Sequence, residues 1–507
     1  MYPKKDAIFV LLKTLSRGEK RAFKIYASKY SKDETNMMVW LFDTISNQNE
    51  YNEKQVKQKL SKQNVKTPLA VLKTKLFTLV LKSVSGQTTL NVNGHPIFSI
   101  NEKVEYANIL YHRGLFAEAN NYLEKACKLA VKHENFEQIL FLLKQKIEVA
   151  KKHLPSNKCN NLLSKIAVER QVILEKLQNQ WAYNKLRQDI VTHYRKYDEP
   201  QNEEEVNAYA NLFENELLTD SKKALSVLAL MNYYNIQTFR YNILGDKAEA
   251  LKHTQELVRI VEENKDIVQF EPDWIFSALN NVMTLAIELK DNKLFDETLN
   301  KLNTVSTELK NLTLYNQKRI FEIKYTLLYS KFIRNGLIDE GLNLIDELKK
   351  GIEQYKSIGL SADRVLRFYF SIALLYYYKG NSFESQKWLY KIIEVEEDTA
   401  LTVMCFARVL DVMLDFESGD YELLNHKLIS VTRFLKKYNR LLQIESIIIK
   451  KIKQLIKVTD ESRKRVILQK LAVEISESDE KNPKSRIMFY LRIGDWVQKN
   501  VSKSLKK

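Results

Sequence analysis

The residues of this 507-residue sequence that are best suited to bind a partner stand in three short clusters. Lysine and arginine neutralise phosphates and carboxylates, and tyrosine combines a large apolar ring with a polar hydroxyl. Such side chains favour contact with a polyanion or a protein rather than a chemical reaction. The candidate contact residues are Lys73, Lys75, Lys82, Tyr376, Tyr377, Tyr378, Arg463, Lys464 and Arg465.

The motifs that usually mark an enzyme do not occur in the sequence. It contains no phosphate-binding loop of the GxxxxGK(S/T) type, no GxGxxG and no GxSxG. The seven histidines show no close metal-ligand spacing, and the three cysteines, Cys127, Cys159 and Cys405, lie far apart. We therefore predict a protein that is not an enzyme, that holds no cofactor or metal, and that keeps its thiols buried and reduced.

The tyrosine cluster lies on a predicted helix that ends near Gly380. Consecutive residues of a helix point about 100° apart, so Tyr376, Tyr377 and Tyr378 do not all face one side. At least one of the three rings should reach a surface or groove, where a partner would meet it. The alternative interpretation is that these rings only pack within the protein.

The basic clusters allow a binding and a structural interpretation. Lys73, Lys75 and Lys82 lie on a predicted helix over residues 69–84 that follows a shorter one, an order that suggests a DNA-contacting helix-turn-helix. That helix is apolar on several sides, which favours burial in a small domain instead. The cluster at residues 463–465 suggests contact with nucleic acid or an acidic protein, or else a solvated end of a helical stack.

The elements that would position these residues are indicated by the few glycines of the sequence. Glycine favours helix ends because it adopts positive φ without a Cβ penalty. Small or apolar residues recur five, nine and twelve positions after each of five glycines, as expected where two helices pack closely. These turn glycines are Gly114, Gly245, Gly336, Gly380 and Gly419.

Three further positions complete a series of eight predicted turns. Lys293 has the same pattern without glycine, and Pro155 and Pro200 interrupt polar stretches where a helix does not easily continue. The turns are then 39 to 48 residues apart, a period that indicates stacked pairs of helices. The predicted fold class is all-α, with a right-handed α-solenoid of antiparallel helix pairs.

The run Leu110–Ala119, followed by Tyr122–Ala126, resembles a tetratricopeptide repeat in its order of glycine, aromatic residue and two alanines. Residues 246–250 resemble it more weakly. The resemblance implies a helical-repeat surface that binds other proteins, and it implies no common chemistry. The patterns at residues 15–24 and 40–45 are similar to the start of uncharacterised tetratricopeptide-like proteins of the Bacteroidetes, a likeness that carries no activity with it.

The repeat register divides the sequence into four predicted parts. A basic N-terminal helical domain lies outside the register, a linker with glycine and proline follows, and the solenoid and a basic capping helix come after it. Within the first part we predict about five short helices, one of them opened by a capping box of Ser16 and Glu19. The bounds of the four parts are 1–85, 86–100, 101–480 and 481–507.

The net charge of +17 is concentrated toward both ends of the sequence. Residues 1–85 hold 17 Lys and Arg against 7 Asp and Glu, and residues 433–507 hold 20 against 8. Residues 86–432 hold 43 against 48. Because charge placement bears on partners rather than on fold, a partner of mixed charge is expected.

No apolar stretch approaches the length of about 20 residues that spans a membrane, and the N-terminus does not match a signal peptide. We therefore expect a cytoplasmic protein. The leading hypothesis is a non-enzymatic scaffold that binds a protein or peptide in the groove of its solenoid. The alternative is a transcriptional or signalling regulator, in which the N-terminal helices contact DNA and the solenoid senses a peptide or protein.

Overall fold

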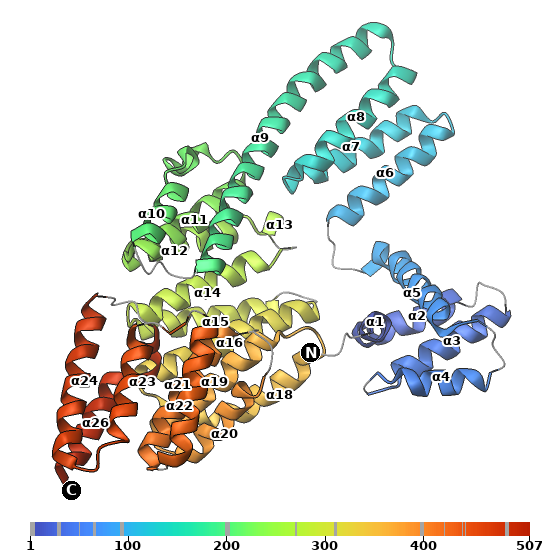
Figure 1. Ribbon diagram of the computed structural model, residues 1–507. Helices are drawn as coiled ribbons and strands as arrows, with labels where there is room; N and C mark the ends of the chain where they lie inside the picture. The colour runs from blue at the N-terminus through green and yellow to red at the C-terminus, as the bar shows by residue number, and fades with distance from the viewer. Residues whose placement is uncertain are drawn as a thin grey trace. The chain divides into compact units, whose positions relative to one another are not determined.

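The computed structural model confirms that the fold is all-α, because every regular element among the described residues is a helix (Figure 1). The chain forms two compact units. Unit 1 holds residues 1–190, 214–282 and 300–317, and unit 2 holds residues 191–213, 283–299 and 318–507. The structure describes residues 6–27, 32–49, 51–63, 67–91, 96–197, 203–268, 271–308, 312–395, 400–419, 421–438, 440–441, 443–481 and 486–506.

Unit 1 begins with the five helices that the sequence predicts for its N-terminal part. They are α1 (Ala7–Thr14), α2 (Arg17–Ala27), α3 (Lys32–Ser46), α4 (Glu53–Ser61) and α5 (Leu69–Asn91). The predicted capping box opens α2: the Ser16 amide donates to Glu19 Oε2 at 2.7 Å, and the Glu19 amide donates to Ser16 Oγ at 3.2 Å. Each helix contributes to one buried apolar core, with Leu12, Phe23, Leu41, Val56 and Leu76 among its members.

The segment 86–100, predicted as a linker, is helical on both sides of residues 92–95, which lie outside the described residues. α5 continues through Gly86 to Asn91, and α6 (Pro96–His112) begins at Pro96. Glycine in a helix interior costs only about 1 kcal/mol relative to alanine. Proline is well placed at the first position of a helix, since its missing N–H removes no hydrogen bond there. The expectation of an irregular segment is therefore corrected to two helix ends.

The remaining helices of unit 1 pack in neighbouring pairs, and α6, α7 and α8 lie side by side (Figure 1). Two short 3-10 helices, η1 and η2, precede α11. The bounds are α7 (Phe116–Lys132), α8 (Phe136–His153), α9 (Ser156–Tyr197), η1 (Glu216–Leu218), η2 (Ser221–Lys223), α11 (Val227–Leu244), α12 (Lys247–Glu263) and α13 (Lys265–Val268).

Helices α14, α15 and α16, like α9, have residues in both units. The helices from α16 onward share one large apolar core in unit 2. Of residues 481–507, predicted as a single capping helix, the described residues 486–506 form two helices, α25 and α26. The bounds are α10 (Glu203–Phe213), α14 (Asp273–Glu288), α15 (Asn292–Glu308), α16 (Leu314–Asn335), α17 (Ile338–Asn343), α18 (Ile345–Lys356), α19 (Ala362–Lys379), α20 (Ser382–Ile393), α21 (Leu401–Ser418), α22 (Tyr421–Lys437), α23 (Gln443–Leu455), α24 (Glu461–Lys481), α25 (Arg486–Leu491) and α26 (Ile493–Lys506).

The backbone at the predicted turns confirms the glycine series. All five turn glycines have positive φ, between 71° and 91°. Within the described part of the chain, no atom lies within 4 Å of a Cβ built on any of them. Backbone handedness rather than crowding therefore favours glycine at these turns. Pro155 separates α8 from α9 as predicted, and Pro200 lies outside the described residues.

The turn without glycine lies three residues earlier than predicted. Lys290, not Lys293, has positive φ, 60°. The next amide, of Asp291, donates to the carbonyl of Ala286 at 2.9 Å, a bond that closes a helix end of this kind. The corrected position divides the interval between the neighbouring turn glycines into 45 and 46 residues, which is a more even spacing.

The small residues that follow the turns are buried where two helices approach closely. A Cβ on Gly341 would lie 2.6 Å from Leu375 Cδ1, and Ser385 Oγ donates to the carbonyl of Ala373 at 2.8 Å. Both contacts require a small side chain at the fifth position after the turn. Buried residues at this position include Ala119, Ala250, Gly341 and Ser385.

After Pro155, the structure has one helix where the period predicts a pair. α9 runs for 42 residues without a turn. Residues 156–197 contain neither glycine nor proline, so no residue type there favours a break. The single helix corrects the regular pattern of helix pairs in this part of the chain.

Candidate interaction surfaces

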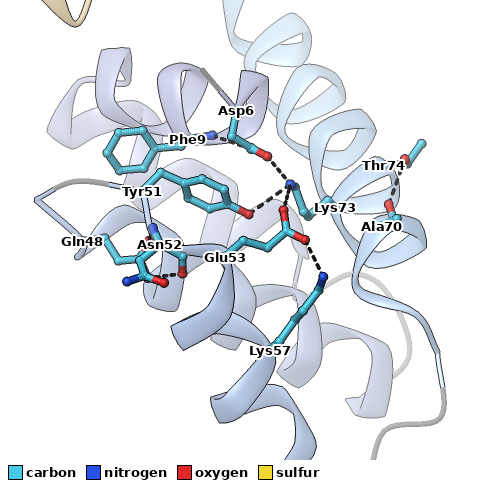
Figure 2. Close-up of polar contacts among 10 residues, drawn as sticks. All are labelled: Asp6, Phe9, Gln48, Tyr51, Asn52, Glu53, Lys57, Ala70, Lys73 and Thr74. Carbon is cyan, nitrogen blue, oxygen red and sulfur yellow. Dashed lines mark hydrogen bonds and ion pairs between the residues drawn. The ribbon is translucent and has the colours of Figure 1, made fainter. Parts of the chain in front are cut away.

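Lys73 lies inside an ion-pair network of the N-terminal helices (Figure 2). Its Nζ contacts the carboxylate of Asp6, donates to Tyr51 Oη at 3.0 Å and lies 3.7 Å from Glu53 Oε2. Asp6 also caps α1 by accepting a hydrogen bond from the Phe9 amide at 3.4 Å. The network therefore links α1, α4 and α5, and only 18% of the Lys73 side chain is exposed.

The charges of this network stabilise one another. Burial lowers the pKa of Lys73, but its hydrogen bonds to Asp6 and Tyr51 outweigh burial and raise that pKa. Burial raises the pKa of the Tyr51 hydroxyl, which keeps it protonated. A hydrogen bond from Lys57 lowers the pKa of Glu53. Lys73 is thus a charged group engaged within the domain.

Lys75 and Lys82 lie on another face of α5. Both are exposed, and because two helical turns separate them they share a face. Leu72, Leu76 and Val80 form the buried side of the helix. The three lysines that the sequence groups as candidates therefore do not form one surface.

Replacing Lys73 by methionine should lower the free energy of unfolding by about 1–2 kcal/mol, because it leaves the Asp6 carboxylate, 14% exposed, without its cation. Lys57→Met is the matched control, since the Lys57–Glu53 pair is 63% and 45% exposed and should contribute less than about 1 kcal/mol. Urea denaturation measures both. Equal stabilities of the two variants would show that the buried network contributes nothing special.

The consecutive basic residues of α24 do not form a single patch. Arg463 is 81% exposed and lies 3.7 Å from Asp460, whereas Lys464 is 17% exposed and pairs with Glu461 at 2.8 Å. Arg465 is half-buried. Because neighbouring helix residues diverge by about 100°, Arg463 alone of the three presents its charge fully to solvent.

The tyrosine cluster at the end of α19 contacts a distant segment of the same chain. Tyr376, Tyr377 and Tyr378 are half-buried, and burial raises the pKa of each hydroxyl. Tyr378 Oη donates to the carbonyl oxygen of Tyr490, which lies 112 residues further along the sequence. One of the three tyrosines therefore meets a helical segment, and that segment belongs to this chain.

Residues 486–506, which comprise α25 and α26 and are called here the C-terminal segment, also contact the end of α16. Arg492 Nη2 donates to the carbonyl of Ile333 at 2.6 Å, and its guanidinium lies 4.4 Å from the ring centroid of Tyr378. The last carbonyls of a helix lack partners within the helix, so a cation is favourable there. Arg492 itself has left-handed backbone, with φ 42°.

Two aromatic side chains of the C-terminal segment contact α19 and α21, and α26 also packs along α24. The Tyr490 ring centroid lies 6.3 Å from that of Phe370 and 6.2 Å from that of Phe406, and Trp496 lies 5.7 Å from Phe416. Lys499 Nζ lies 2.7 Å from Glu417 Oε2. The residues that receive the segment, called here the docking face, are Ile333, Phe370, Tyr378, Phe406, Phe416 and Glu417.

Helices α20, α21 and α22 share a buried charge cluster that the sequence analysis missed. Lys427 Nζ lies 2.9 Å from Asp411 Oδ2 and 2.6 Å from Asp415 Oδ2, and both carboxylates are 7% exposed. Gln386 Nε2 donates to Asp415 Oδ1 at 2.6 Å. Burial lowers the pKa of Lys427, but its hydrogen bonds to both aspartates raise that pKa by more, so the net shift is upward. The available signal was a pair of aspartates four residues apart in the middle of a largely apolar helix.

A cavity of ≈ 220 Å³ in unit 1 lies beside the turn between α7 and α8. It is smaller than the roughly 300–1,000 Å³ of typical small-molecule sites. Glu134, which lines it, already accepts a hydrogen bond from the Val227 amide at 2.8 Å. The cavity therefore indicates no particular ligand.

The cysteines form no disulfide, and burial raises the pKa of Cys127 and of Cys405 to about 11, so both stay protonated thiols. Within the part of the chain that the structure describes, no three His, Cys, Asp or Glu side chains gather where they could hold a metal ion. In the same residues, every helix is too short or too polar to cross a membrane.

Comparison with known proteins gave no match to a family model, to a curated protein or to a solved structure. The tetratricopeptide-like resemblance and the likeness to Bacteroidetes proteins therefore stay predictions from the sequence.

Proposed function

We propose that this chain is a cytoplasmic, non-enzymatic scaffold that binds a helical segment of another protein, and that its helix pairs form a tetratricopeptide-like, right-handed α-solenoid. The recurring positive-φ turns and the buried small residues after them support a repeat. The long helix α9 would interrupt that repeat in unit 1.

The observation that carries this proposal is the way the docking face holds the C-terminal segment. Aromatic rings of α19 and α21 receive Tyr490 and Trp496, and a carboxylate and a helix C-terminus receive Lys499 and Arg492. Apolar anchors surrounded by polar contacts are how grooves of helical proteins recognise amphipathic helices. A surface that holds one such helix has the chemistry to hold another.

The regulator hypothesis has less support. Of the three candidate lysines on α5, Lys73 is engaged with Asp6 and Tyr51, and Lys75 and Lys82 share the exposed face. Specific DNA-binding proteins commonly neutralise about six to ten phosphates. Two lysines on one helix supply a small part of such a surface.

Crosslinking tests the scaffold proposal. The full chain is isolated from cells of its source after treatment with a lysine crosslinker, and the crosslinks are mapped by mass spectrometry. We expect a second protein in a fixed molar ratio, crosslinked to Lys379 or Lys499, which are 50% and 49% exposed and lie beside the docking face. Isolation of the chain without such a protein, or with a tightly bound metabolite in its place, would contradict the proposal.

A charge reversal on the docking face provides the matched comparison. Glu417→Lys should release the partner, because it repels the basic residues that this face accommodates. Lys185→Glu changes a 77% exposed side chain of α9 and should leave the partner bound. Retention of the partner by both variants would show that binding does not use the docking face.

A further inference from the structure

We propose that the C-terminal segment is an internal ligand that covers the docking face and is displaced by the partner. The proposal rests on the scaffold function and specifies its regulation and the class of partner. The partner is an amphipathic helix with aromatic anchors and flanking Lys or Arg residues, which is the chemistry of the segment itself.

The contacts of the segment follow the pattern of a bound helix. Tyr490 and Trp496 supply apolar anchors. Arg492 places positive charge at the C-terminal end of α16, and Lys499 places it beside Glu417. Trp496 is only 1% exposed, and with Leu491 and Ile493 it is buried in the apolar core of unit 2. Binding of this kind is carried by a few buried anchors, and each can be supplied by another helix.

The contact is also imperfect, which makes displacement possible. Arg492 has φ 42°, an unfavourable backbone for a residue with a Cβ. Trp496 Nε1 and Glu417 Oε1 are buried, and neither has a hydrogen-bond partner among the described residues. Buried polar atoms without partners destabilise the state in which the C-terminal segment covers the docking face. A partner helix that keeps the anchors and satisfies these atoms would bind the docking face better than the segment does.

The charge of the docking face selects the partner. Glu417, which is 9% exposed, belongs to this face, and the carbonyl end of α16 adds partial negative charge. Both favour a basic helix and disfavour an acidic one. The selection is consistent with the segment, which contacts these two groups through Lys499 and Arg492.

Hydrogen exchange on the unmodified full chain tests the opening of the segment. We expect the slowest amides of α26 to exchange at least about tenfold faster than those of α21, through an opening that leaves α21 folded. Equal rates for both helices, limited by global unfolding, would overturn the proposal and identify α26 as an integral part of the core.

Competition with a fluorescein-labelled copy of residues 486–506 tests displacement. The apparent affinity of the docking face is reduced by the fraction of molecules in which it is covered. The full-length variant Arg492→Ala with Lys499→Ala weakens the internal contact, so it should bind the labelled peptide about tenfold more tightly than the unmodified chain does. Gln498→Ala changes an exposed residue of the same helix and should match the unmodified chain.

The outcomes separate this proposal from the scaffold function. Equal peptide binding by all three chains would overturn displacement, while a crosslinked partner at Lys379 would still support the scaffold. If the fraction of dimer rose with protein concentration and the labelled peptide dissociated the dimer, the occupant of the docking face would be a second copy of this chain. That result would overturn the proposal that the occupant is a helix of another protein. An acidic peptide of the same length that binds equally well would overturn the charge selection.

Discussion

Replacing Lys427 by methionine should destabilise unit 2 by about 3–5 kcal/mol. The substitution removes the cation that lies within 2.9 Å of both Asp411 and Asp415, whose carboxylates are 7% exposed. Two like charges would then remain buried side by side. Burial already raises the pKa of Asp411, and loss of the lysine would raise it further. Chemical denaturation followed by circular dichroism measures the loss.

Two further variants establish that the effect comes from buried charge. Lys387→Met removes a 58% exposed partner of Glu384 on the same helix pair and should cost less than about 1 kcal/mol. Adding Asp411→Asn and Asp415→Asn to Lys427→Met removes the unpaired charges and should recover most of the stability. If the triple variant were as unstable as Lys427→Met alone, lost packing rather than charge would be the cause.

Gly351→Ala is expected to destabilise the protein by about 2–3 kcal/mol, although alanine usually stabilises a helix. The helix propensity of alanine would contribute about 1 kcal/mol in its favour. The added Cβ, however, would lie 2.0 Å from Phe321 Cε2 and 2.6 Å from Cζ, far inside van der Waals contact. The ring has little freedom to move, since its centroid lies 4.8 Å from that of Tyr325 and 5.1 Å from that of Tyr355. Overpacking of this kind outweighs the propensity gain.

Gly494→Ala is the control, because no atom of the described residues lies within 4 Å of a Cβ at that helical position. It should leave the melting temperature unchanged or slightly higher. Combining Gly351→Ala with Phe321→Leu should cost less than the sum of the two single variants, since the smaller side chain makes room for the new methyl. A Gly351→Ala variant that melts at or above the unmodified chain would contradict the close packing of α18 against α16.

Local features of the fold were accessible from the sequence. Turn glycines, the Ser16–Glu19 capping box and the buried fifth positions each depend on residues a few positions apart, where residue type sets geometry directly. Errors arose where a residue type has two uses. Pro96, which was included in the predicted linker, begins α6, and the turn predicted at Lys293 lies at Lys290.

The candidate surfaces were less accessible because their partners are distant in the sequence. Lys73 meets Asp6 across 67 residues, and Tyr378 meets Tyr490 across 112. A helical pattern shows which residues share a face, but it does not show which element covers that face. Helix geometry predicted only that at least one of the three tyrosines would reach a surface or groove. That Tyr378 contacts Tyr490 could be learned only from the structure.

The turns between the helices limit which substitutions such a sequence can accept during evolution. The turns at Gly336 and Gly380 have two requirements: a residue with left-handed backbone and, five positions later, a side chain that fits a narrow space. Lys290 demonstrates that even the first requirement can be met without glycine, at a modest conformational cost. Exposed positions elsewhere can change at little cost in stability, whereas closely packed positions such as Gly351 cannot. Sequence divergence would therefore remove the recognisable repeat motif long before it changed the arrangement of the helices.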